Sequence, residues 1–144
     1  MRLVVDASVA LKWVLGSDRP EANREQAAAL LQAIADARVS AIQPVHWIAE
    51  VMAVVARMDP PRIDPTLAFL DAVPFKTADS PVLYQSAARL SADRSQHLFD
   101  TLYHAVAIEH DAMLVTADER YYAAARDLGH IVHIRDLALP AASP

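Results

Sequence analysis

Residues 2–8, Arg2-Leu3-Val4-Val5-Asp6-Ala7-Ser8, set the organisation of the chain: a short apolar strand runs into a lone carboxylate where the next helix must begin. In an open α/β sheet, ligands are held at the carboxyl ends of the strands. Asp6 therefore stands where such a fold builds its site. We expect it to form one wall of an acidic pocket that binds a metal ion.

Strand and helix patterns alternate along the rest of the chain. Strands are expected at residues 2–5, 39–42, 73–77, 113–116 and 130–134. Helices are expected at residues 7–15, 21–37, 44–58, 66–72, 81–90, 98–110 and 118–128. This alternation predicts an α/β fold of three layers, α/β/α, with a mostly parallel central sheet.

Local signals mark the ends of several elements. Pro44 is expected to open the helix 44–58, because proline is well tolerated at the first helical position. Residues 16–20 are expected to form a turn and residues 91–96 a polar loop. Gly129 is expected to end the helix before it.

The composition limits the class of protein. The chain has 144 residues, of which 54% are hydrophobic, so we expect one domain over residues 1–144 with a sizeable core. It has no cysteine, which excludes disulfides and zinc–thiolate sites and is compatible with a reducing cytosol. Its two glycines exclude a phosphate-cradling glycine loop. No apolar stretch approaches the roughly 18 residues of a membrane span, so a cytoplasmic location without membrane contact is expected.

The formal net charge of −5 argues against a protein that wraps duplex nucleic acid with a broad basic face. The same net charge is compatible with an enzyme that contacts a few phosphates through a metal ion.

Four carboxylates stand out, and each has a structural alternative. Glu50 lies in the middle of the apolar helix 44–58, where the alternative is an ion pair with Arg57 or with an arginine from elsewhere in the chain. Asp100 lies in the first turn of a helix, a position that the helix dipole favours. Asp6 and Asp118 each follow a strand and can cap the next helix.

Their joint placement favours a shared site. Asp6 and Asp118 follow strands that end at the same edge of the sheet, and Asp100 and Glu50 lie on helices that reach the same edge. Clustered carboxylates repel one another and raise their own pKa values, a penalty that a bound cation removes. Mg²⁺ and Mn²⁺ prefer such oxygen ligands, and one or two of these ions can support phosphodiester hydrolysis.

Four motifs together resemble a PIN domain, and most closely the VapC-type toxins of bacterial toxin–antitoxin pairs. They are Val5-Asp6-Ala7-Ser8, Glu50, Asp100-Thr101-Leu102-Tyr103 and Val115-Thr116-Ala117-Asp118. The resemblance covers essentially the whole chain, and it departs at Thr101, where alanine is commoner.

This resemblance implies a PIN-like, flavodoxin-like fold and a ribonuclease that depends on Mg²⁺ or Mn²⁺. It also implies a homodimer, neutralised by a small VapB-type antitoxin whose tail enters the active-site groove. By resemblance, the catalytic and metal-binding set is Asp6, Glu50, Asp100 and Asp118. Ser8 and Thr116 match family positions whose hydroxyls support the acidic side chains without binding the metal ion themselves.

Other residues carry weaker signals whose roles stay open. His97 and His104 can contact a phosphate or pack in the core. Phosphate contacts are also open to the cations Lys12, Arg62 and Arg120. The aromatic residues Trp13, Trp47 and Tyr103 suit base stacking, but core packing is the simpler reading.

Two other functions compete with a ribonuclease. A receiver-like phospho-acceptor signalling domain shares the layered fold, but it needs an acidic pair where Asp6 stands alone and a lysine where the last strand offers His133-Ile134-Arg135. A PIN-like binding module without catalysis keeps the fold, and the complete acidic set argues against it.

Overall fold

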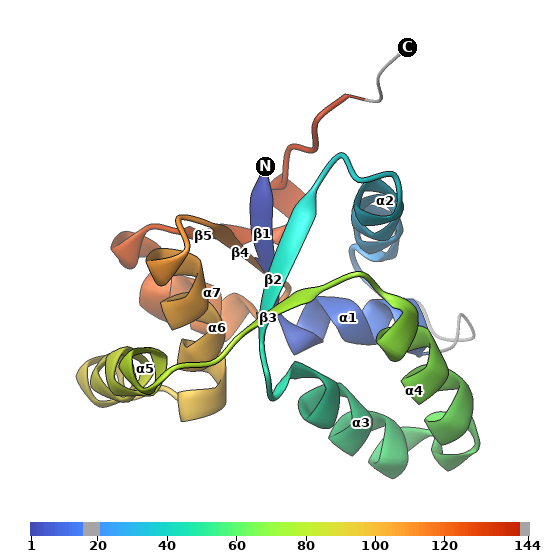
Figure 1. Cartoon of the computed structure of the whole chain (residues 1–144), viewed down its shortest axis with the longest axis horizontal. Helices are drawn as coiled ribbons and strands as arrows, with labels where there is room; N and C mark the ends of the chain where they lie inside the picture. The colour runs from blue at the N-terminus through green and yellow to red at the C-terminus, as the bar shows by residue number, and fades with distance from the viewer. Residues whose placement is uncertain (16–20, 142–144) are drawn as a thin grey trace.

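The computed structural model describes residues 1–15 and 21–141, and five parallel strands form its centre (Figure 1). The strands are β1 (Arg2–Val5), β2 (Ser40–Pro44), β3 (Lys76–Ala78), β4 (Met113–Thr116) and β5 (Ile131–His133). They are ordered β3-β2-β1-β4-β5, and every neighbouring pair is parallel. The predicted parallel sheet is confirmed, with the opening strand at its centre. The turn expected at residues 16–20 lies outside the described residues.

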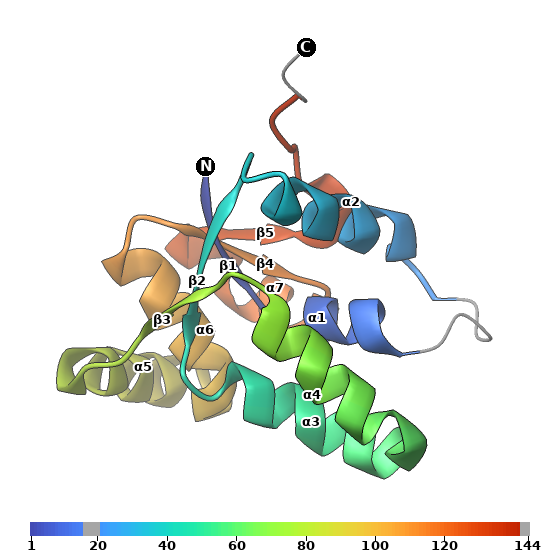
Figure 2. The same ribbon diagram turned by 45° about the vertical axis from the view of Figure 1, so that its right-hand side comes forward.

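Helices cover both faces of this sheet, so the three predicted layers are confirmed (Figure 2). The α-helices are α1 (Ala7–Val14), α2 (Arg24–Ala35), α3 (Trp47–Met58), α4 (Ile63–Ala72), α5 (Pro81–Arg94), α6 (Leu98–Glu109) and α7 (Glu119–Ala125). Short 3₁₀ helices occur at η1 (Pro60–Arg62), η2 (Arg126–Leu128) and η3 (Ile134–Asp136). No helix in the part of the chain that the structure describes is long and apolar enough to cross a lipid bilayer.

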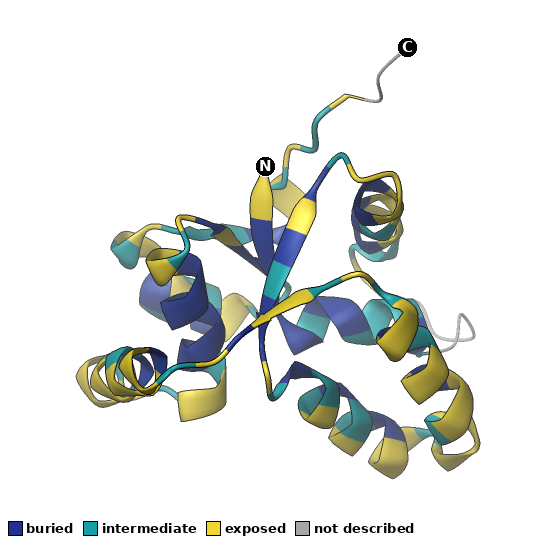
Figure 3. Ribbon diagram, viewed as in Figure 1, coloured by how far each residue is buried: buried dark blue, intermediate teal, exposed yellow. Residues whose placement is uncertain are grey.

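The alternation of side chains along β1 divides the core in two. Leu3 and Val5 pack with α2 on one face, whereas Val4 packs with α6 on the other. Residues 101–107 of α6 are all buried, because this helix lies between the sheet and α5 (Figure 3). The buried segment 101–107 anchors α6 and so positions the residues at its start, which lie at the edge of the sheet.

The order of the strands places a crevice beside β1. The chain winds from β1 through β2 to β3, and then returns to β4 on the other side of β1. Ligands in open α/β sheets bind at such a reversal of strand order, outside the carboxyl ends of the strands. Receiver domains use the order 2-1-3-4-5 instead, so this topology disfavours the phospho-acceptor alternative.

Two local predictions are wrong. Pro44 does not open a helix: it ends β2, opposite Ala78, and α3 begins at Trp47. The fixed φ of proline suits an extended residue as well as a first helical turn, so its presence alone does not choose between them. Helix α5 runs on to Arg94, through most of the expected polar loop, and ends at Ser95, whose φ of 52° is left-handed. Gly129 follows the 3₁₀ helix η2, and its φ of 72° lies in a range that glycine adopts readily.

Candidate active site

Asp6 leaves the end of β1 and points its carboxylate towards the end of β4. Its backbone N–H donates to the carbonyl of Val115 at 3.0 Å. Its side chain is 8% exposed and does not cap α1. Instead, Oδ2 accepts hydrogen bonds from Ser8 Oγ at 2.5 Å and from Thr116 Oγ1 at 2.9 Å. The helix-cap alternative for Asp6 is therefore wrong.

Both of these hydroxyls are oriented by the turn between β4 and α7. The N–H of Ala117 donates to Ser8 Oγ at 3.0 Å, and the N–H of Asp118 donates to Thr116 Oγ1 at 3.0 Å. Because each hydroxyl oxygen accepts from a backbone amide, its own proton is directed at Asp6. Both protons go to Oδ2, while Oδ1 of Asp6 accepts no hydrogen bond from the residues that the structure describes.

The surroundings of Asp6 disfavour its charge. Burial raises its pKa from 3.8 to about 6, against the lowering effect of the Ser8 and Thr116 hydrogen bonds. The negative charges of Glu50 and Asp100 raise it further. A buried carboxylate with a perturbed pKa and an open oxygen is typical of a functional site.

Glu50 reaches this region from α3 and is half-buried. Its Oε2 accepts a hydrogen bond of 2.9 Å from the hydroxyl of Tyr103 and lies 3.2 Å from Nε2 of His46. Burial, followed by the charge of Glu50, raises the pKa of the Tyr103 hydroxyl, which therefore stays a neutral donor. The alternative ion pair with Arg57 is wrong, since the side-chain contacts of Glu50 within the described residues are with Tyr103 and His46.

His46 connects Glu50 to the start of α6. Its ring stacks on Phe99, with the ring centres 5.2 Å apart, and its Nε2 lies 3.1 Å from the Phe99 carbonyl. Its Nδ1 is buried without a hydrogen-bond partner among the residues described. His46 thus fixes Glu50 beside the helix that carries Asp100.

Asp100 lies in the first turn of α6 and is half-buried. Burial raises its pKa, and the charges of Glu50 and Asp118 raise it further, whereas His97 and His46 lower it. The four carboxylates are therefore linked electrostatically: Asp6 feels Glu50 and Asp100, and Asp100 feels Glu50 and Asp118.

Asp118 forms the helix N-cap that the sequence offered as its structural alternative. Its Oδ1 accepts a hydrogen bond of 2.9 Å from the N–H of Tyr121 and caps α7. Within the part of the chain that the structure describes, its other carboxylate oxygen, Oδ2, accepts no hydrogen bond. An N-cap and a metal ligand are compatible roles for one aspartate.

The donor chemistry of these carboxylates fits a hard divalent cation, although no ready-made cluster is present. Within residues 1–15 and 21–141, no three histidine, cysteine or acidic side chains converge closely enough to hold a metal ion. Mg²⁺ keeps several of its waters and often binds proteins through only one or two carboxylates, so a closed set of ligands is not required. Burial is the largest cause of the raised pKa values of Asp6 and Asp100, and neighbouring carboxylates add to it, so a bound cation would favour the charged form of both groups.

Most of the weaker candidates are engaged elsewhere. Lys12 pairs with Glu21 at 2.8 Å, and Arg62 pairs with Asp59 at 2.8 Å. His104 is buried between the Tyr121 hydroxyl and the Gly129 carbonyl, and burial lowers its pKa, so it is a core residue.

The aromatic candidates also pack internally. Trp13 donates to the Ala27 carbonyl at 2.8 Å, and Trp47 is buried in the core. His97 and Arg120 are exposed, and His97 lies close enough to Asp100 to act on its pKa.

Sequence reasoning missed two residues that support the site. His46 lies four positions before Glu50, a spacing that places both on one helical face and is the signal that could have found it. Gln43 is a fully buried polar residue in β2, and nothing in its local sequence pointed to a partner.

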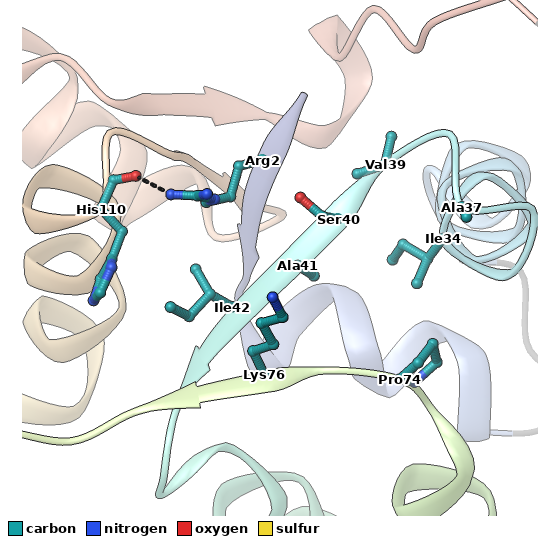
Figure 4. Close-up of a pocket in the computed structure, with 10 residues that line it drawn as sticks. All are labelled: Arg2, Ile34, Ala37, Val39, Ser40, Ala41, Ile42, Pro74, Lys76 and His110. Atoms are coloured by element: carbon teal, nitrogen blue, oxygen red, sulfur yellow. Dashed lines mark hydrogen bonds between the residues drawn. The ribbon is translucent and has the colours of Figure 1, made fainter.

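A separate cavity of about 370 Å³ lies at the opposite end of the sheet (Figure 4). Arg2, Ser40 and Lys76 contribute to its lining, and Arg2 donates to the carbonyl of His110 at 3.0 Å. These residues are at the amino ends of β1, β2 and β3. The cavity is therefore distinct from the carboxylate site, and none of the four acidic residues lines it.

Solved structures with the same fold come from several organisms. A toxin–antitoxin complex from Klebsiella pneumoniae matches with a TM-score of 0.68 and 17% identity, over 93% of this chain and 98% of that chain. FitAcB from Neisseria gonorrhoeae matches with a TM-score of 0.63 and 18% identity, over 95% and 100%. PAE2754 from Pyrobaculum aerophilum matches with a TM-score of 0.60 and 16% identity, over 93% and 89%. No curated protein sequence matches the chain.

The sequence itself matches the family model described as "PIN domain" over residues 3–127. This range begins within β1 and ends within η2, so it contains all four acidic residues and the two hydroxyls. The match agrees with the five-stranded parallel sheet and with the resemblance of the acidic motifs. The chain belongs to the PIN domain family.

Proposed function

We propose that this chain is a metal-dependent endoribonuclease and the toxin of a toxin–antitoxin pair. PIN domains are generally nucleases, and they generally use divalent metal ions. The observation that carries the proposal is the environment of Asp6, whose carboxylate is buried, held at one oxygen by two hydroxyls and surrounded by further acidic charge.

The acidic set Asp6, Glu50, Asp100 and Asp118 is proposed to hold Mg²⁺ or Mn²⁺. When bound, such an ion activates water and stabilises the leaving oxygen during phosphodiester hydrolysis. Ser8 and Thr116 hold Oδ2 of Asp6, which leaves Oδ1 to face the cation. Tyr103 and His46 hold Glu50 at the same edge of the sheet.

The proposed substrate is RNA and not a long DNA duplex. The net charge of −5 disfavours a broad electrostatic grip on duplex phosphates. Lys12 and Arg62, two of the cations considered for phosphate contacts, already pair with carboxylates. An enzyme of this kind binds a short segment through the cation and a few side chains.

We propose a VapB-type antitoxin and a second copy of the chain as partners. The Klebsiella pneumoniae structure is a toxin–antitoxin complex of the same fold, and we propose that an antitoxin tail enters the acidic groove of this chain. A homodimer surface is supported by exposed apolar side chains that line one cavity of about 230 Å³ beside α5 and α6. They are Val45, Tyr84, Leu98 and Phe99.

The decisive experiment compares the wild-type protein with Asp6→Asn, Asp100→Asn. Each is incubated with single-stranded and structured RNAs in Mg²⁺, in Mn²⁺ or in excess EDTA. We expect cleavage that needs the ion and is lost in the double variant, while its circular dichroism spectrum is retained.

The matched control removes two exposed carboxylates on other helices, as Glu25→Gln, Asp71→Asn. This control is expected to cleave at the wild-type rate. Wild-type cleavage by Asp6→Asn, Asp100→Asn would show that the acidic site is misassigned. A wild-type protein that neither cleaves RNA nor binds Mn²⁺ in calorimetry would be a binding module instead.

A further inference from the structure

The side-chain amide of Gln43 forms two hydrogen bonds with the backbone of Val5. Its Oε1 accepts from the Val5 N–H at 2.7 Å, and its Nε2 donates to the Val5 carbonyl at 2.7 Å. Gln43 and Val5 are both fully buried. The bonds are short, and they satisfy the donor and the acceptor of one backbone residue.

This contact replaces backbone hydrogen bonds that β2 does not make with β1 at Val5. Backbone pairing between β1 and β2 is limited to Arg2 with Ser40 and Leu3 with Ala41. Further along, β2 turns to pair with β3, starting at Ile42. Val5 would then face β2 with its N–H and carbonyl unpaired, which is costly for buried backbone groups. A primary amide carries a donor and an acceptor side by side, so Gln43 fills this gap with one side chain.

The Val5 carbonyl belongs to the peptide that joins Val5 to Asp6. Gln43 holds this peptide from the β2 side, and the N–H of Asp6 holds it from the β4 side by donating to Val115 at 3.0 Å. Because a peptide unit is planar, fixing its oxygen and its N–H fixes the orientation of the plane. That orientation sets the direction in which the Asp6 side chain leaves the backbone.

We propose that Gln43 is a positioning residue for Asp6: by clamping the Val5–Asp6 peptide, it directs the open carboxylate oxygen of Asp6 towards a divalent cation. This inference rests on the proposed function. Gln43 contacts neither the cation nor the substrate, and it acts through the backbone alone. Ser8 and Thr116 fix the far end of the same side chain, so Asp6 is held at its backbone and at Oδ2.

The test compares Gln43→Met, Gln43→Glu and a destabilised control, Leu70→Ala. Methionine keeps the length of the side chain and removes both hydrogen bonds, whereas glutamate keeps an acceptor for Val5 N–H and loses the donor to Val5 O. Leu70 is buried on α4, so its truncation lowers stability without touching the clamp. Mn²⁺ affinity is measured by calorimetry, and the Mn²⁺ concentration for half-maximal RNA cleavage is measured separately.

We expect Gln43→Met to weaken Mn²⁺ binding and to raise the half-maximal Mn²⁺ concentration about tenfold, the lower end of what residues supporting metal ligands contribute. Gln43→Glu should behave similarly, and Leu70→Ala should lower the melting temperature with Mn²⁺ affinity unchanged. Amide hydrogen exchange of Val5 should be faster in Gln43→Met than in Leu70→Ala, which tests the clamp without a metal ion.

The outcomes separate the inference from the function on which it rests. If the wild-type protein binds Mn²⁺ and cleaves RNA while Gln43→Met matches Leu70→Ala in every measurement, the positioning role is wrong and the proposed function stands. If the wild-type protein shows neither binding nor cleavage, the proposed function itself is wrong.

Discussion

The hydroxyl of Tyr103, on the buried helix α6, donates a 2.9 Å hydrogen bond to Oε2 of Glu50 on α3. This contact joins two helices that are distant in sequence and fixes a carboxylate at the edge of the sheet. Its donor is neutral, because burial and the nearby acidic charge raise the pKa of the phenol. Glu50 is therefore held in place by a neutral donor, so no guanidinium or ammonium group is needed to hold it and offset its negative charge.

Replacing Tyr103 by phenylalanine removes only this donor. We expect Tyr103→Phe to lower the free energy of unfolding by about 1 kcal/mol and to slow RNA cleavage about tenfold, because Glu50 loses its anchor. Urea denaturation and initial cleavage rates measure the two effects. Tyr122→Phe, on the half-buried Tyr122 of α7, is the control and should leave cleavage unchanged. Equal rates for both variants would contradict this role of Tyr103.

Removing the hydroxyls around Asp6 should raise its pKa above about 6, since their hydrogen bonds stabilise the charged form. Ser8→Ala and Thr116→Val are therefore expected to move the carboxyl titration of Asp6 to higher pH, as followed by ¹³C NMR without metal ions. Thr116→Ser keeps a hydroxyl and should titrate close to the wild-type protein. An unchanged midpoint in Thr116→Val would mean that the hydroxyls do not act on Asp6.

The pKa of Asp6 predicts how stability depends on pH without metal ions. The folded pKa of about 6 lies above the ordinary value of 3.8, so the folded state binds the proton more tightly. Stability should therefore fall as pH rises from about 4 to about 6, by up to about 3 kcal/mol, and stay reduced above that range. Asp6→Asn removes this penalty and should unfold at higher urea than the wild-type protein at pH 7.5.

At pH 4 that advantage should nearly disappear, because the wild-type carboxyl is then protonated as well. Asp64→Asn, at an exposed carboxylate on α4, keeps Asp6 and should follow the wild-type protein at both pH values. A wild-type protein that gains stability between pH 4 and pH 6 relative to Asp6→Asn would contradict the raised pKa.

A cation at this site should stabilise the folded chain by mass action. We expect Mn²⁺ to raise the melting temperature of the wild-type protein, with about 1.4 kcal/mol of added stability for each tenfold increase in concentration above saturation. EDTA should reverse the effect, and Asp6→Asn, Asp100→Asn should not respond. A response in the double variant equal to that of the wild-type protein would place the ion elsewhere.

The proposed homodimer can be tested by substituting two apolar residues whose side chains are equally exposed. Val45, which lines the cavity near α5 and α6, and Leu67, on α4, are each 47% exposed. We expect Val45→Glu to give a monomer in sedimentation equilibrium, because it would bury a charge in the proposed interface. Leu67→Glu should stay dimeric. A monomeric wild-type protein would contradict the dimer, and the reverse pattern would move its interface to α4.

The sequence predicted the layers and the central strand because these follow from local patterns. Apolar strands alternate with amphipathic helices, and a carboxylate directly after β1 must lie at the edge of the sheet. Pro44 was misread because proline suits both a strand end and a first helical turn. The bonds from Gln43 to Val5 and from Tyr103 to Glu50 span 38 and 53 positions, and no local pattern encodes such pairs.

The cap that Asp118 forms on α7 has a consequence for the proposed metal site, because it would make two cations of equal charge bind differently. Its Oδ1 is engaged by the amide of Tyr121, so an ion that chelated both oxygens would break the cap and fray the first turn of the helix. Ca²⁺ accepts bidentate carboxylates in a loose shell, whereas Mg²⁺ takes single oxygens in a strict octahedron. If Asp118 is a ligand of the proposed cation, helix α7 would therefore favour the smaller ion, since only single-oxygen coordination would leave its first turn intact.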